Sequence, residues 1–211
     1  MPFNKRLLGL LAGSIFYGLS ASVAHAVMIN EVSPDAGELL GTAQDTTGTG
    51  AVLESISGTL INLGTVADPV DDVDLYNILI TNPAAFSVTV TASLSEDNDA
   101  QLYLFDAAGI EVLYNDDRGV DDFLPQFDAG DLIDPAGEFF LAFNLWATAP
   151  LTVGNLGAGW DNDPGPFQTG PYTLSLTGVE TAGAAVPEPS TLVLLSLGLA
   201  GFGFMRRKMK S

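Results

Sequence analysis

Apolar and polar residues alternate through the central part of this chain, and this alternation restricts it to β-structure. From Phe86 to Leu94, and again from Tyr172 to Thr177, every second residue is apolar and the residues between are Ser or Thr. Successive side chains of a β-strand point to opposite faces of the sheet. Both runs therefore predict strands with one buried and one solvated face.

Runs of β-forming residues predict five more strands, at residues 53–63, 74–81, 101–105, 110–114 and 139–146. The last run is apolar at nearly every position, so we expect a central strand covered on both faces, with Trp146 in the core. Turn-forming residues separate the runs at short intervals. We predict an all-β domain, an antiparallel, jelly-roll-like β-sandwich of seven or eight short strands.

The N-terminal residues have the pattern of a secretory signal peptide. Lys5 and Arg6 precede an apolar run, and small residues, Ala24 and Ala26, occupy the two positions that signal peptidase recognises. We predict a signal helix over residues 1–26, cleavage by signal peptidase after Ala26, and export. A buried N-terminal helix is the alternative, but it would neither begin with charges nor end in a cleavage-site triplet.

The C-terminal residues combine a proline-rich motif, an apolar run and a basic end. The motif is Val186, Pro187, Glu188, Pro189 and Ser190, and the basic end is Arg206, Arg207, Lys208 and Lys210. Residues 191–205 carry no charge. As a helix they would be about 22 Å long, against a hydrocarbon core of about 30 Å. We expect a short hydrophobic helix that occupies the inner membrane transiently, with its basic end in the cytoplasm.

This order of parts resembles the PEP-CTERM sorting signal of Gram-negative bacteria, over residues 186–211. The resemblance implies that an exosortase in the inner membrane cuts near Glu188 and passes the protein to the cell surface, the outer membrane or the extracellular matrix. It also implies an organism that makes exopolysaccharide, which is therefore a candidate partner. An ordinary single-span anchor is the alternative, and the motif and the short apolar run argue against it.

Composition limits what the remaining residues, 27–185, can do. They hold 25 acidic residues against one basic residue, Arg118, for a formal charge of −24. A surface of this charge repels nucleic acid, so nucleic acid is excluded as a partner. These residues contain no Cys or Lys, and the only His of the chain, His25, lies in the signal peptide. A Ser-His-Asp triad, a Cys-His pair and zinc held by His or Cys are therefore excluded.

The central region also resembles the bacterial pre-peptidase C-terminal domain, over most of residues 29–179. The likeness lies in Asn30-Glu31, Thr42-Ala43-Gln44, Ser57-Gly58-Thr59-Leu60 and Asp72-Val73-Asp74-Leu75-Tyr76, and in residues 102–109, 134–141 and 170–174. It implies a jelly-roll-like sandwich, usually appended to secreted proteases, with binding or secretion-linked roles and calcium in some members. This sequence departs from that pattern, since no protease precedes the domain and residues 144–170 form a long insert.

Acidic clusters between the predicted strands are candidate calcium ligands. Ca²⁺ binds six to eight oxygens, and loops dense in Asp and Asn supply them at close spacing. The candidate metal ligands are Asp71, Asp72, Asp74, Asp97, Asp99, Asp116 and Asp117. None of the clusters matches an EF-hand loop. The alternative, which we favour for any single cluster, is that these residues cap turns and keep strand edges solvated.

Trp160 is followed by Asp161 and Asp163 in a segment rich in Gly and Pro. An exposed Trp beside acidic groups can stack on a sugar ring while the acids bond its hydroxyls. Trp160, Asp161 and Asp163 are therefore candidate ligand residues. The alternative, which we favour, is that Trp160 packs a long loop onto the sandwich.

Together these features predict a non-catalytic, exported cell-surface or matrix protein that binds calcium and polysaccharide. One alternative is a small secreted glycan hydrolase that uses two carboxyl groups. Two buried carboxyl groups facing each other across a groove lined by Trp146 or Trp160 would favour it. The other alternative is a structural surface-layer subunit, which predicts self-association.

Overall fold

The computed structural model describes residues 26–32, 35–46, 50–62, 73–92, 94, 99–146, 148–161 and 168–181. These residues are all-β, as predicted, with one 3₁₀ turn, η1 (Pro83–Ala85). No helix in these ranges is long and apolar enough to cross a membrane. The helices predicted for residues 1–26 and 191–205 lie outside the described residues, except that Ala26 begins a strand.

Thirteen strands are present in the described ranges, so the predicted number of seven or eight is too low. Their bounds are β1 Ala26–Asn30, β2 Gln44–Asp45, β3 Val52–Asn62, β4 Val73–Ile80, β5 Ser87–Ala92, β6 Ala100–Asp106, β7 Glu111–Asn115, β8 Gln126–Phe127, β9 Gly137–Leu145, β10 Pro150–Thr152, β11 Asn155–Trp160, β12 Gln168–Thr177 and β13 Val179–Thr181. The long strands match the predicted runs. Several added ones have two or three residues each, too few for an alternating pattern to be recognised.

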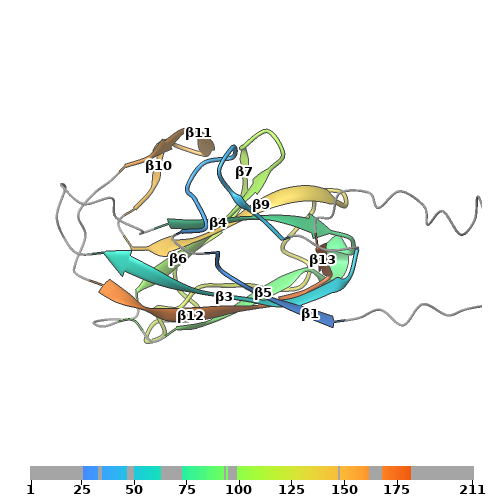
Figure 1. Cartoon of the computed structure of the whole chain (residues 1–211), viewed down its shortest axis with the longest axis horizontal. Helices are drawn as coiled ribbons and strands as arrows, with labels where there is room; N and C mark the ends of the chain where they lie inside the picture. The colour runs from blue at the N-terminus through green and yellow to red at the C-terminus, as the bar shows by residue number, and fades with distance from the viewer. Residues whose placement is uncertain are drawn as a thin grey trace, which may run out of the picture.

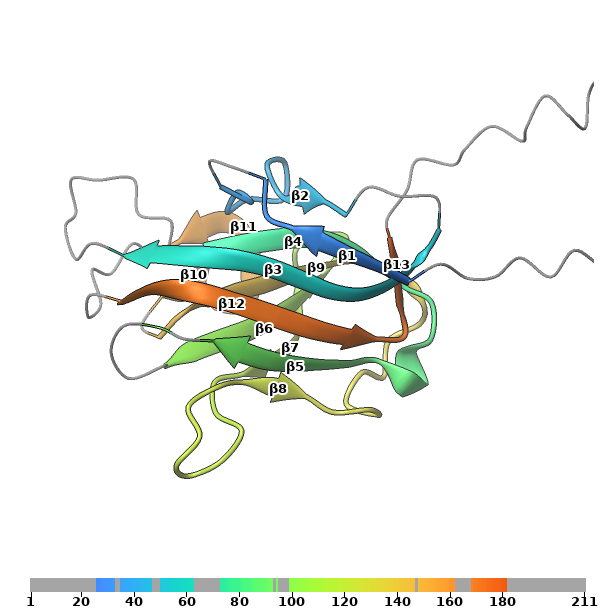
Figure 2. The ribbon, with the colours of Figure 1, turned by 60° about the horizontal axis from the view of Figure 1, so that its bottom comes forward.

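Eleven of these strands form one sheet that folds over on itself. Its order is β7-β6-β9-β4-β13-β3-β12-β5-β8, with β1 paired to β3 and β2 to β4. Figures 1 and 2 show two layers, with β4, β6, β7 and β9 in one and β3, β5, β8 and β12 in the other. β13 joins the layers because it pairs with both β3 and β4. The domain therefore resembles a sandwich but consists of a single, mainly antiparallel sheet.

The two ends of this sheet meet at one hydrogen bond. The backbone N–H of Gln126 in β8 donates to Asn115 Oδ1 in β7, at 3.1 Å. The sheet is consequently nearly closed and barrel-like. The two strands outside it, β10 and β11, form a separate antiparallel ribbon.

The main hydrophobic core lies between the two layers. β5 and β12 pair side by side, and their apolar residues Val88, Val90, Leu174 and Leu176 face this core. These are the positions that the alternation of apolar and polar residues predicts to be buried. The opposite layer contributes the inward residues of β4, β6 and β9, among them Leu141.

A second cluster covers the outer face of β4, β6 and β9. Its buried members are Val73, Leu75, Tyr103, Phe105, Ala142, Leu156 and Trp160. Two of them, Leu156 and Trp160, belong to β11, so the β10–β11 ribbon forms this cover. β9 is thus buried on both faces, as its apolar sequence predicts. Trp146 is different, because it follows the last residue of β9 and is 49% exposed, so its predicted place in the core is wrong.

Gly58 in β3 is required by the side chain that lies over it. Tyr172 in β12 is the register partner of Gly58, and a Cβ at Gly58 would stand 2.4 Å from the Tyr172 hydroxyl oxygen. That hydroxyl cannot move aside freely, because it is hydrogen-bonded to Asp74 and to Tyr76. A side chain at position 58 would therefore break a buried polar contact.

We predict that Gly58→Ala lowers the free energy of unfolding by about 1–3 kcal/mol, the usual effect of overpacking. The measurement is equilibrium unfolding in urea. Gly137→Ala in β9 is the matched control, because a Cβ there meets nothing within 4 Å. Its effect should be within about 0.5 kcal/mol of zero. Equal losses in the two variants would contradict the close approach of Tyr172.

Candidate carboxylate site

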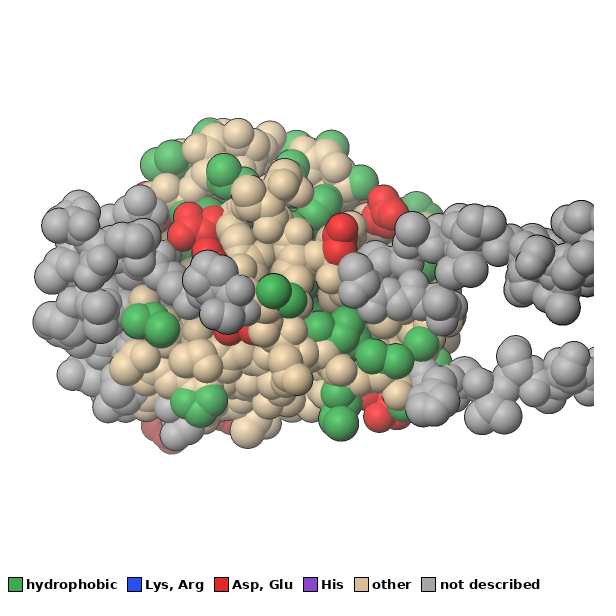
Figure 3. Space-filling view, in the orientation of Figure 1, with side chains coloured by type: hydrophobic (Ala, Val, Ile, Leu, Met, Phe, Trp, Pro, Cys, Tyr) green, Lys and Arg blue, Asp and Glu red, His purple; other side chains and the backbone are tan. Residues whose placement is uncertain are grey.

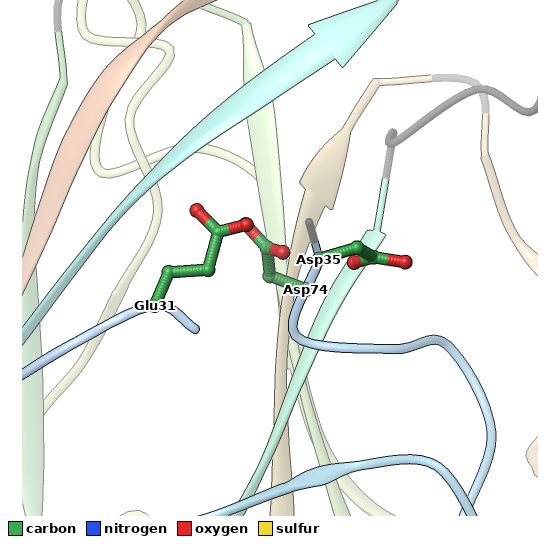
Figure 4. A group of neighbouring side chains, drawn as sticks. All are labelled: Glu31, Asp35 and Asp74. Carbon is green, nitrogen blue, oxygen red and sulfur yellow. The ribbon is translucent and has the colours of Figure 1, made fainter. Parts of the chain in front are cut away.

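Three carboxyl groups from two separate segments meet where β1 ends and β4 begins. Glu31 directly follows β1, Asp35 lies four residues later, and Asp74 is the second residue of β4. One oxygen of each lies within 4.8 Å of one oxygen of each other. Figure 4 shows the carboxyl groups of Glu31 and Asp74 pointing toward one another, with Asp35 on the far side of Asp74. We call this group the carboxylate site.

Hydrogen bonds of the backbone position Glu31 and Asp35. The Glu31 N–H donates to the Ser57 carbonyl at 2.8 Å, and Glu31 Oε2 accepts the Thr59 N–H at 2.8 Å. These bonds continue the pairing of β1 with β3 and hold the Glu31 carboxylate against β3. Asp35 Oδ1 accepts the N–H of Gly37 at 2.9 Å, the local bond that Asp commonly makes in turns.

Gln44 holds the segment between β1 and Asp35 in place. Its Nε2 donates to the carbonyl of Asn30 at 3.0 Å, and its Oε1 accepts the N–H of Val32 at 2.7 Å. Gln44 itself is buried and begins β2, which pairs with β4. The segment that carries Glu31 is therefore fixed from two sides, by β3 and by β2.

Asp74 is fully buried and belongs to a network of hydroxyl groups. Tyr172 donates its hydroxyl to Asp74 Oδ2 at 2.5 Å, and the hydroxyl oxygens of Tyr172 and Tyr76 lie 2.6 Å apart. Burial, followed by the negative charge of Asp74, raises the pKa of Tyr172. Tyr172 therefore remains a hydrogen-bond donor at any ordinary pH and stabilises a buried acidic group.

Negative charges gather at the carboxylate site, and the one basic residue among residues 27–185 is bonded elsewhere. Burial raises the pKa of Glu31 above its ordinary value of 4.5; the bond from Thr59 opposes this shift and the charge of Asp35 adds to it. Arg118, the single basic residue of the domain, instead bonds Asp122 Oδ2 at 3.3 Å and the Val90 carbonyl at 2.8 Å. The described surface in Figure 3 likewise carries acidic and no basic side chains.

A surface cavity of about 300 Å³ opens beside Glu31. It is lined by Asn30, Glu31, Ser57, Gly58 and Thr59. Three of these residues, Asn30, Ser57 and Thr59, carry neutral side-chain oxygens. The carboxylate site thus borders a space that water or an ion could enter, and its donors are the oxygens that hard cations prefer.

The structure brings only one of the seven predicted metal ligands, Asp74, into this site. Asp71, Asp72 and Asp97 lie outside the described residues. Asp99 precedes β6, and Asp116 and Asp117 follow β7; no second group of three acidic residues gathers in the described ranges. Glu31 and Asp35 are missing from the prediction, although Asn30-Glu31 is part of the pre-peptidase C-terminal likeness and offered a signal.

Trp160 is buried, so its predicted availability to a sugar ring is wrong. Only 5% of Trp160 is exposed, and its ring stands edge-on to Tyr103 and Phe105, with centroids 5.5 and 5.9 Å away. Its Nε1 donates to the Glu38 carbonyl at 2.7 Å. Trp160 packs β11 onto the sheet, which is the alternative that we favoured. Asp161 accepts the Ala149 N–H at 2.5 Å, and Asp163 lies outside the described residues.

Comparison with known families identifies the C-terminal residues. A family model described as the PEP-CTERM protein-sorting motif matches residues 185–208. This match confirms the sorting motif predicted from the sequence. The motif implies processing by exosortase, export through the cell envelope and association with the cell surface. The comparison with curated proteins gave no match. The likeness to the pre-peptidase C-terminal domain stays a prediction.

The raised pKa of Glu31 predicts how stability varies with pH in the absence of metal. A carboxyl group whose pKa is higher in the folded state binds its proton more tightly there. The resulting stabilisation is complete below pH 4.5 and is lost as the pH rises through the raised pKa. In EDTA, Glu31→Gln should therefore weaken the decline of unfolding free energy on going from about pH 4 to 8. Glu54→Gln, which removes an exposed carboxyl group, should keep the wild-type decline, and a decline unaltered by Glu31→Gln would contradict the assignment.

Proposed function

We propose that this chain is delivered to the cell surface by the exosortase route and displays there a non-catalytic β domain. The sorting motif at residues 185–208 carries the proposal. The distribution of charge supports it, because six of the seven Lys and Arg residues lie in residues 1–26 and 186–211. Removal of both segments leaves a strongly acidic domain suited to remain soluble outside the cell.

The finer part of the proposal is a calcium ion held by Glu31, Asp35 and Asp74. Three carboxylates this close repel one another, and protons, hydrogen bonds or a cation must offset this repulsion. Calcium accepts carboxylate oxygens together with neutral oxygens and water, in flexible geometry. The cavity beside Glu31 is lined by Asn30 and Ser57, whose side chains carry such neutral oxygens. Calcium also is chemically suited to a domain without His and Cys.

We propose that the domain is not catalytic, because the geometry of the same three carboxyl groups does not suit a hydrolase. Asp74 is fully buried, so a substrate cannot reach it without opening the sheet. Glycosidase carboxyl pairs stand about 5–9.5 Å apart, with the sugar between them. Glu31 and Asp74 instead face each other directly, and neither Trp lines the cavity beside them. This arrangement favours a structural site over a hydrolase.

Exopolysaccharide is the surface partner that we propose for the displayed domain. The exosortase route supports it through the resemblance, and Trp146 offers a half-exposed aromatic ring in place of Trp160. A surface-layer subunit remains the alternative. The two differ in solution, because a layer subunit associates with its own copies and does not bind glycan.

We predict that calcium raises the melting temperature of residues 27–185, since a ligand that binds only the folded state stabilises it. The double substitution Glu31→Gln with Asp35→Asn should abolish this rise, because it removes two carboxylate ligands. Asp116→Asn with Asp117→Asn is the matched control and should keep the rise. Thermal melting in EDTA and over a calcium series is the measurement. A melting temperature that is constant over the whole series would refute the calcium site.

We predict that Pro187→Ala with Glu188→Ala leaves the C-terminal tail uncut, because both substitutions lie in the recognised motif. The measurement is the intact mass of the exported protein together with its location in cell fractions. Glu180→Gln, an acidic residue of β13 outside the motif, should be processed like the wild type. Normal mass and location in the double variant would rule out the exosortase route.

A further inference from the structure

The first and last strands of the described chain, β1 and β13, lie close together. Ala26, the first residue of β1, pairs with Val52 of β3 from one side, and Glu180 of β13 pairs with Val52 from the other. Two strand spacings, about 10 Å, therefore separate Ala26 from Glu180. Figures 1 and 2 show β13 and the start of β1 at the same end of the molecule. Both membrane-directed segments are therefore attached to one end of the domain.

The two processing sites differ in their position along the chain relative to the strands. Cleavage by signal peptidase is predicted after Ala26, and both residues of that bond are paired, Ala26 with Val52 and Val27 with Leu53. At the other end, β13 ends at Thr181, and four residues separate Thr181 from the sorting motif at Val186. The first cleavage site lies inside a strand, and the sorting motif follows the last described strand in the sequence.

We infer that folding makes the signal-cleavage bond inaccessible to signal peptidase. The peptidase must therefore act before β1 pairs with β3. The reaction is hydrolysis of the Ala26–Val27 amide bond. Water supplies the hydroxyl group of the new Ala26 carboxyl and a proton for the new Val27 amine. A peptidase must take this bond into its own cleft as a separate extended chain, which β1 cannot offer while it is paired. The inference goes beyond the proposed function, because it concerns the order of folding and processing.

Bonds outside the strand pairing hold β1 against local opening. The N–H of Glu31 donates to the Ser57 carbonyl, and the carbonyl of Asn30 accepts from Gln44 Nε2. Ile29 packs against the main core. Complete release of β1 from the sheet requires each of these contacts to break. An edge strand that is fixed in this way opens less often than a frayed terminus.

The test uses the full-length precursor and purified signal peptidase in detergent micelles. In one arm the precursor is diluted from urea directly into enzyme, and in the other it is refolded first. We expect the refolded precursor to be cut after Ala26 at least about tenfold more slowly, as judged by intact mass. Equal rates in the two arms would overturn the inference. Absence of cleavage after Ala26 in both arms would overturn it as well, because the site would not exist.

A pair of matched variants separates release of β1 from general loosening. Gln44→Ala removes the side chain that holds residues 30 and 32, and should speed cleavage of the refolded precursor several-fold. Gln101→Ala removes a similarly buried amide, bonded to Tyr114 and Asn144 in the layer opposite β1 and β3, and should leave cleavage slow. Equal acceleration by both would overturn the inference. The outcome is independent of the motif variants at Pro187 and Glu188, so failure here leaves the sorting proposal standing.

Discussion

The long strand β3 is the element on which the rest of the domain depends, because it is hydrogen-bonded to three other strands. It pairs with β12 along one edge and, at Val52, with β13, which turns the sheet toward the second layer. Along its other edge it pairs with β1, which delivers Glu31 to Asp74. The chain has no Cys, so no disulfide can replace these contacts. Backbone pairing and the core between the layers determine both the fold and the carboxylate site.

Burial of Asp74 imposes a condition on the surrounding sheet. A carboxyl group removed from water must be hydrogen-bonded, protonated or paired with a cation. Tyr172 meets the first requirement, and Gly58 makes the approach of Tyr172 possible because it has no side chain. Glu31 and Asp35 then bring further negative charge to the same place. The interior of the sheet therefore holds a carboxyl group, Asp74, and the groups around it determine how its negative charge is offset.

The sequence was most informative where a structural pattern is local. β5 and β12 were predictable because side chains alternate within a single strand, and the sorting motif because its residues are contiguous. Glu31 and Asp35 escaped prediction because the parallel pairing of β1 with β3 brings them to Asp74 from far along the chain. Burial of Trp160 is the favoured interpretation of the sequence, but the segment around it forms β11 instead of the expected loop. Contacts between distant segments produce no periodic pattern in the sequence, so pattern analysis does not reveal them.

The near closure of the sheet affects how copies of the domain interact when they are crowded outside the cell. An open strand edge invites a neighbouring molecule to add its own strand, and crowding favours this. Here the long strands β3, β4, β9 and β12 have partners on both sides, and the last gap is bridged between Gln126 and Asn115. The high negative charge adds mutual repulsion. Few open edges and mutual repulsion therefore both act against strand addition between crowded copies.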